Sequence, residues 1–94
     1  MANERSTSVW DALVDSPEEA ENLRLRSKLM RELTRAVRAW DLPQKDAAKR
    51  LRVTQPRLSE LLNGKIDKFS LDALVNLLAN ADLKVDFTVK GKAA

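Results

Sequence analysis

The chain contains no cysteine and no histidine among its 94 residues. Without cysteine it can form neither a disulfide bond nor a thiolate nucleophile. Without histidine it lacks the commonest metal ligand and the side chain that most often transfers protons near neutral pH. Carboxylates alone can perform acid–base chemistry, but these absences argue against hydrolytic or metal-dependent catalysis. We therefore expect a protein that is not an enzyme and that needs no cofactor or metal ion.

Long hydrophobic runs are also absent from the chain. No apolar stretch approaches the roughly 18 residues that a transmembrane helix needs, and the N-terminal sequence MANERSTS lacks the order of a signal peptide. We expect a cytoplasmic protein with no membrane association. A hydrophobic content of 44% beside a charged content of 33% is typical of one small globular domain.

The segment from Gln44 to Gly64 has the spacing of two short helices joined by a tight turn. Each half carries apolar residues three to four positions apart, which is the interval of one buried helical face. Thr54 can cap the second helix, and Pro56 is tolerated in its first turn because amides there lack helical partners. The segment therefore predicts a helix-turn-helix motif. Its apolar residues are Ala47, Ala48, Leu51, Leu58, Leu61 and Leu62.

Positive charge is concentrated on this predicted motif. Residues 44–68 hold seven lysines and arginines against three acidic residues, a net charge of +4, whereas residues 1–43 carry −1 and residues 69–94 carry zero. The charge alone would describe a solvated basic surface, but charge and motif together indicate binding to nucleic acid. The cations are Lys45, Lys49, Arg50, Arg52, Arg57, Lys65 and Lys68.

Polar side chains on the second motif helix are suited to contacts with DNA. Gln55 can bond adenine and Arg57 can bond guanine through two hydrogen bonds each, with about 1 to 3 kcal/mol of discrimination for a good pair. Glu60 can accept a hydrogen bond from cytosine or can instead hold Arg57 in place. Other contacts, to phosphates, set the register without sequence preference. The predicted DNA-binding residues are Gln44, Lys45, Thr54, Gln55, Arg57, Ser59, Glu60, Asn63 and Lys65.

Two further helices flank the motif. Ser16 and Pro17 form a helix start, and we expect this helix to run to about Trp40. Another helix, capped by Ser70, is expected over residues 71–80. The first helix carries a basic row on the side opposite its apolar face, which is either solvated or a contact for phosphate or an acidic partner. The basic row consists of Arg24, Lys28, Arg31, Arg35 and Arg38.

Residues 84–90 change to a period of two, in which Val85, Phe87 and Val89 alternate with polar residues. This pattern predicts a half-buried strand. A lone strand cannot satisfy its own backbone donors and acceptors, and the chain shows no second strand. We therefore expect pairing with an edge strand of another protein or, preferably, with the same strand of a second copy in a two-fold dimer. Such a dimer suits a palindromic DNA site.

The chain resembles the small helix-turn-helix proteins of the XRE or phage-repressor-like superfamily, and specifically the HigA-like antitoxin group. The resemblance is carried by LPQKDAAKRLRVTQPRLSELLNGK, by IDKFSLDALVNLLANADLKVDFTV and, upstream, by VWDALVDSPEEAENLRLRSKLM. It implies an all-α, lambda-repressor-like domain of five helices or fewer, with Gln44, Asn63 and Lys65 on the DNA backbone. It also implies a repressor that binds a RelE-like toxin and represses its own promoter as a dimer.

Two residues depart from the superfamily pattern. Arg52 stands where a glycine is common in the turn, so it must either adopt a left-handed conformation or alter the turn. Pro56 replaces a residue that elsewhere can donate from its side chain, so direct hydrogen bonding to a base is lost at this position.

The N-terminal part of the chain has no lysine or arginine between Ser6 and Leu23. Residues 1–15 are expected to be a tail with a short apolar segment, and residues 16–94 the helix-turn-helix domain with its motif at 44–64. RelE-like toxins are generally basic, so the acidic and apolar residues 9–21 are the hypothesis for the toxin surface. Alternatively, the acids stabilise a helix N-terminus and the apolar residues pack on the first long helix. The apolar residues are Val9, Trp10 and Leu13.

Two other functions fit the same sequence. One is a stand-alone XRE-type transcriptional regulator without a toxin partner, which the lack of an adjacent toxin gene would favour. The other is an interaction module that binds no DNA and uses its basic faces for an acidic protein.

Overall fold

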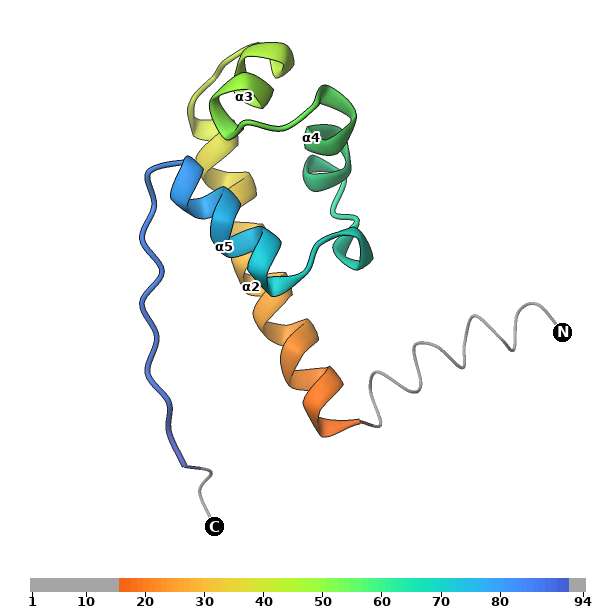
Figure 1. Ribbon diagram of the computed structural model, residues 1–94, viewed down its shortest axis with the longest axis vertical. Coiled ribbons are helices and arrows are strands. Elements are labelled where there is room, and N and C mark those ends of the chain that lie inside the picture. Colours follow the sequence, from red (N-terminus) through yellow and green to blue (C-terminus); the bar gives the residue numbers. More distant parts are fainter. Residues whose placement is uncertain (1–15, 92–94) are drawn as a thin grey trace, which may run out of the picture.

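Four α-helices and one 3-10 turn make up the part of the chain, residues 16–91, that the computed structural model describes (Figure 1). They are α2 (Pro17–Ala39), α3 (Gln44–Leu51), α4 (Gln55–Leu62), the 3-10 turn η1 (Ile66–Lys68) and α5 (Leu71–Asn80). The all-helical class predicted from the sequence is confirmed for these residues. The predicted tail and short apolar segment, residues 1–15, lie outside the described residues.

Helix α2 begins and ends where the sequence predicts. The Ser16 Oγ accepts a hydrogen bond from the Glu19 amide at 3.3 Å, and Pro17 occupies the first turn. The helix ends at Ala39, and Asp41 follows with a φ of 53°, which takes the backbone out of the helical path. With its 23 residues, α2 is long enough to contact α4, η1 and α5.

Helices α3 and α4 are the two helices predicted for the motif. The turn between them passes through Arg52, which adopts the left-handed conformation with φ 62° and ψ 42°. The Asn80 side chain of α5 donates to the Leu51 carbonyl at 2.9 Å and so satisfies one of the free acceptors at the end of α3. The Thr54 hydroxyl then caps α4 by accepting from the Arg57 amide at 3.3 Å.

A single core joins the motif to α2 and α5. In Figure 1, α3 and α4 lie at one end of the molecule and α5 lies along α2. Ala47 and Ala48 are buried, as predicted, whereas Leu62 is half-buried. The buried positions of α4 are Leu58 and Leu61, which leaves the first turn of this helix at the surface. The largest fully buried side chains are Phe69, Leu33, Leu51, Leu58, Leu61 and Leu74.

The strand predicted over residues 84–90 does not form within the described chain, because no strand is present among residues 16–91. A strand requires a ladder of hydrogen bonds to a neighbour, and this part of the chain offers none. The segment runs back towards the end of the molecule where α2 begins (Figure 1). Val85 packs against the core, whereas Phe87 and Val89 are 81% and 84% exposed. The predicted apolar face is therefore divided between the core and the surface.

We predict that Arg52→Gly stabilises the protein relative to Arg52→Ala. Both variants remove the same charge and side chain, but alanine keeps the Cβ that makes a left-handed backbone unfavourable by about 1 kcal/mol. Urea denaturation followed by circular dichroism should show a free energy of unfolding higher by about that amount for the glycine variant. Equal stability of the two variants would contradict a strained turn.

Candidate nucleic-acid interface

The start of α4 is exposed on the surface of the motif. Thr54, Gln55 and Pro56 are all exposed. Within residues 16–91 the Gln55 side chain forms no hydrogen bond. Its amide can therefore donate and accept at the same time, which is what a paired contact with adenine requires.

The end of α4 presents a second group of the predicted residues. Asn63, which follows the last residue of the helix, donates from Nδ2 to the Ser59 Oγ at 3.2 Å. Gly64 adopts a φ of 71° and turns the chain away from the helix, and Lys65 is exposed directly after it. The corner expected to contact the DNA backbone is therefore on the surface.

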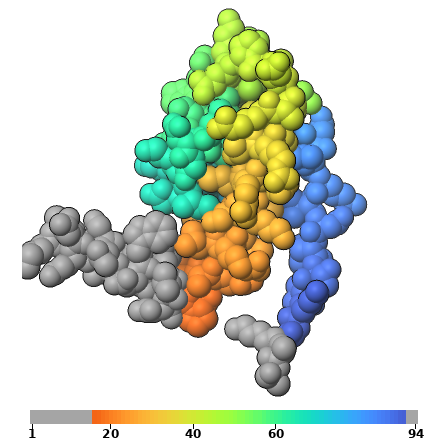
Figure 2. All heavy atoms as spheres, turned by 180° about the vertical axis from the view of Figure 1, so that it is seen from behind, coloured from red at the N-terminus to blue at the C-terminus, as the bar shows by residue number. Residues whose placement is uncertain are grey.

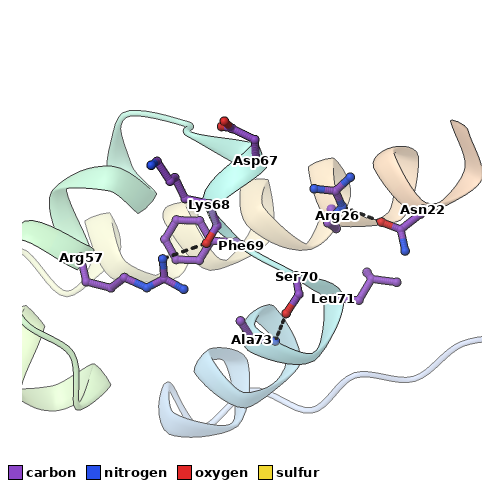
Figure 3. A pocket seen from close by; sticks show the side chains of 9 residues that line it. All are labelled: Asn22, Arg26, Arg57, Asp67, Lys68, Phe69, Ser70, Leu71 and Ala73. Atoms are coloured by element: carbon purple, nitrogen blue, oxygen red, sulfur yellow. Dashed lines mark hydrogen bonds between the residues drawn. The ribbon is translucent and has the colours of Figure 1, made fainter. Parts of the chain in front are cut away.

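The Arg57 side chain, for which the sequence predicts a base contact, lies against other residues of the protein. Its guanidinium lies over the Phe69 ring, 3.9 Å from the centroid, and Nη1 donates to the Lys68 carbonyl at 2.8 Å (Figure 3). Glu60 lies 3.7 Å from the same nitrogen, in agreement with the alternative in which Glu60 holds Arg57. The guanidinium thus faces a turn of the protein itself. Sequence spacing alone cannot reveal this contact between residues 57 and 69.

The start of α3 is another exposed helix end. Pro43 precedes the helix and no side chain caps it, so the first amides of α3 remain available to an anion such as a phosphate. Gln44 and Lys45 are exposed there. A cavity beside Gln44 is also lined by Arg38 and Leu62, which brings the start of α3 close to the end of α4. Arg38 belongs to the basic row predicted from the sequence, but spacing along α2 does not show that it lies beside α3 and α4.

Part of the positive charge on the motif is held by contacts within the protein. The Arg50 guanidinium lies 4.0 Å from the centroid of the Trp40 ring. This cation–π contact links α3 to the end of α2. The cations of residues 44–68 that are exposed and form none of these ring contacts are Lys45, Lys49, Arg52, Lys65 and Lys68.

The basic row lies along α2, which forms the middle of the face shown in Figure 2. Two of its members pair with acids one turn earlier: Arg24 with Glu21 at 2.6 Å and Arg35 with Glu32 at 3.3 Å. The hydrogen bonds that Arg24 donates to Glu21, together with the attraction of the Glu21 charge, raise the pKa of Arg24. Exposed pairs of this kind contribute little to stability. These contacts fit a solvated helix face.

One predicted site lies outside the part of the chain that the structure describes. Val9, Trp10 and Leu13, the predicted toxin contacts, lie outside the described residues. Among residues 16–91 no group of three or more acidic side chains is placed to hold a metal ion. No helix in this part of the chain is long and apolar enough to cross a membrane.

Comparison with known proteins supports the same motif. A family model described as a helix-turn-helix domain matches residues 12–90 of the 94-residue chain. No curated protein matches the chain. The family match extends beyond the two motif helices to α2, α5 and most of the extended C-terminal segment.

Proposed function

The chain belongs to the helix-turn-helix domain family, and we propose that it is a sequence-specific DNA-binding regulator of transcription that acts without catalysis or a cofactor. The observation that carries this proposal is the exposed start of α4, where the Gln55 side chain forms no hydrogen bond within residues 16–91 while Leu58 and Leu61 are buried. In this proposal α4 is the recognition helix and enters the major groove of DNA.

Contacts to the DNA backbone accompany the recognition helix in this proposal. The uncapped start of α3, with Gln44 and Lys45, faces one phosphate group, and Asn63 and Lys65 face another. These contacts supply affinity that depends on salt but not on sequence. Gln55 supplies the preference for particular bases.

We further propose that the regulator is a homodimer that represses transcription from a palindromic site. Residues 84–91 form no backbone hydrogen bond within residues 16–91, and Phe87 and Val89 are almost completely exposed. A second copy of the segment would satisfy the backbone groups and cover both side chains. Two-fold symmetry would also place two recognition helices in successive major grooves.

The antitoxin role rests on the resemblance to the HigA-like group and on charge. The first turn of α2 carries Glu18 and Glu19, and the sequence before it contains Asp11 and Asp15. A basic RelE-like toxin fits an acidic segment whose sequence also contains the aromatic Trp10. We propose that the regulator binds such a toxin through residues 9–21 and represses the operon that encodes both proteins.

DNA binding is tested by titration against two duplexes, the DNA upstream of the protein's own gene and a scrambled duplex of equal length and composition. We expect Gln55→Ala to lose about 1 to 3 kcal/mol of discrimination between the two duplexes, because it removes a base contact.

We expect Lys65→Ala to weaken binding to both duplexes alike and to lower the slope of log affinity against log salt concentration by about 1. As a control, Arg31→Ala, an exposed charge on α2, should leave the discrimination unchanged. Equal, salt-independent affinity of the unmodified protein for both duplexes would overturn the proposal.

The dimer is tested by sedimentation over a range of protein concentrations. We expect Phe87→Asp to shift the equilibrium strongly towards monomer, since it places a charge in the proposed interface. Thr88→Asp adds the same charge at the neighbouring position on the other face of the segment and should have a smaller effect. A monomeric unmodified protein, or a Phe87→Asp variant that dimerises equally well, would rule out this interface.

The toxin surface is tested by co-purification with the product of the adjacent gene. We expect removal of residues 1–15 to abolish retention, because it deletes Trp10 and two of the acidic residues. Gln55→Ala serves as the control and should retain the partner. Undiminished retention by the truncated chain would place the toxin elsewhere, and the absence of a toxin gene beside this one would favour the stand-alone regulator.

A further inference from the structure

Two arginines from different helices hold the η1 turn. Arg26 of α2 donates from Nη1 to the Ile66 carbonyl at 3.1 Å, while its Nε donates to the Asn22 side chain at 2.6 Å. Arg57 of α4 donates to the Lys68 carbonyl at 2.8 Å. Figure 3 shows both guanidinium groups directed towards this part of the chain. The turn therefore links α2 to the first turn of α4.

The Arg57 contact is anchored in the core through Phe69. The Phe69 ring is only 1% exposed, and the guanidinium stacks against it at 3.9 Å from the centroid. The cation–π contact therefore joins the guanidinium to a side chain of the packed core. Glu60, one turn later in α4, adds an ion pair at 3.7 Å. Arg57 is thus held by a backbone carbonyl, a buried ring and a carboxylate at the same time.

We infer that Arg57 is a positioning residue that fixes the orientation of α4 against the core and does not contact a base. A paired contact with guanine needs guanidinium donors that point out of the protein. Here Nη1 is already bonded to Lys68, and turning the side chain towards DNA would break all three contacts. The position of the first turn of α4 therefore depends on Arg57.

The inward position of Arg57 affects which base α4 prefers, a consequence that rests on the proposed function. With Arg57 directed inward, Gln55 is the exposed side chain in the first turn of α4 whose donor and acceptor are both free of hydrogen bonds to residues 16–91. Glutamine pairs with adenine. We therefore expect the strongest preference under α4 to be for an adenine rather than a guanine.

The experiment compares Arg57→Ala and Arg57→Lys with Arg31→Ala, which removes the same charge from an exposed position on α2. Thermal unfolding and selection from a pool of randomised DNA duplexes are measured for each, with binding assayed well below the lowest Tm. We expect Arg57→Ala to lower Tm by about 4 to 8 °C and to weaken every selected sequence by the same factor. Arg57→Lys should recover part of both losses, because an ammonium group can still donate to Lys68 and sit on the ring. Arg31→Ala should change neither quantity.

Three results would overturn the inference. The first is an unchanged Tm with loss of preference at a single base pair, as expected for a base contact. The second is an unchanged affinity of folded Arg57→Ala, as expected for a residue that only stabilises the fold. The third is fully additive Tm losses for Arg57→Ala and Phe69→Leu, since residues in contact should show coupling. If the unmodified protein selects no DNA sequence, the proposed function fails, while the Tm values and the coupling still test the contact.

Discussion

The burial of Leu58 and Leu61 is the constraint on which the rest of the structure depends. Helix α4 has eight residues, too few to be stable alone in water. It exists because these two leucines, 0% and 1% exposed, pack into the core formed with α2, α3 and α5. The same packing decides which face is left for a partner. A side chain at the start of α4 can be both exposed and fixed in position only because the opposite face is buried.

Local chemistry explains why much of the fold could be predicted from the sequence. Ser16, Thr54 and Ser70 each cap a helix at the predicted residue, because a capping hydroxyl bonds to an amide only three positions away. The left-handed turn at Arg52 was one of two predicted outcomes, and it too is determined by neighbouring residues. Effects that act within one helical turn leave a pattern in the sequence.

Contacts between residues that lie far apart in the sequence are harder to predict. The alternation of Val85, Phe87 and Val89 describes two faces of an extended chain, but it does not provide a second strand, and the core takes up Val85 alone. Likewise, the type of residue at position 57 suits a contact with guanine, whereas its real neighbours lie at positions 68 and 69. A count of cations therefore does not show which side chains are free to bond a phosphate, because Arg50 and Arg57 are both stacked on aromatic rings.

The bond from Asn80 to the Leu51 carbonyl has a consequence for synthesis of the protein. It joins the end of α3 to a residue made 29 positions later. The ribosome completes both motif helices before it adds Leu74, Leu77 and Leu78, the side chains of α5 that close the core. A nascent chain that stops short of α5 therefore contains the whole motif without a stable fold. We expect the proposed DNA binding to begin late in translation, when α5 has left the ribosome.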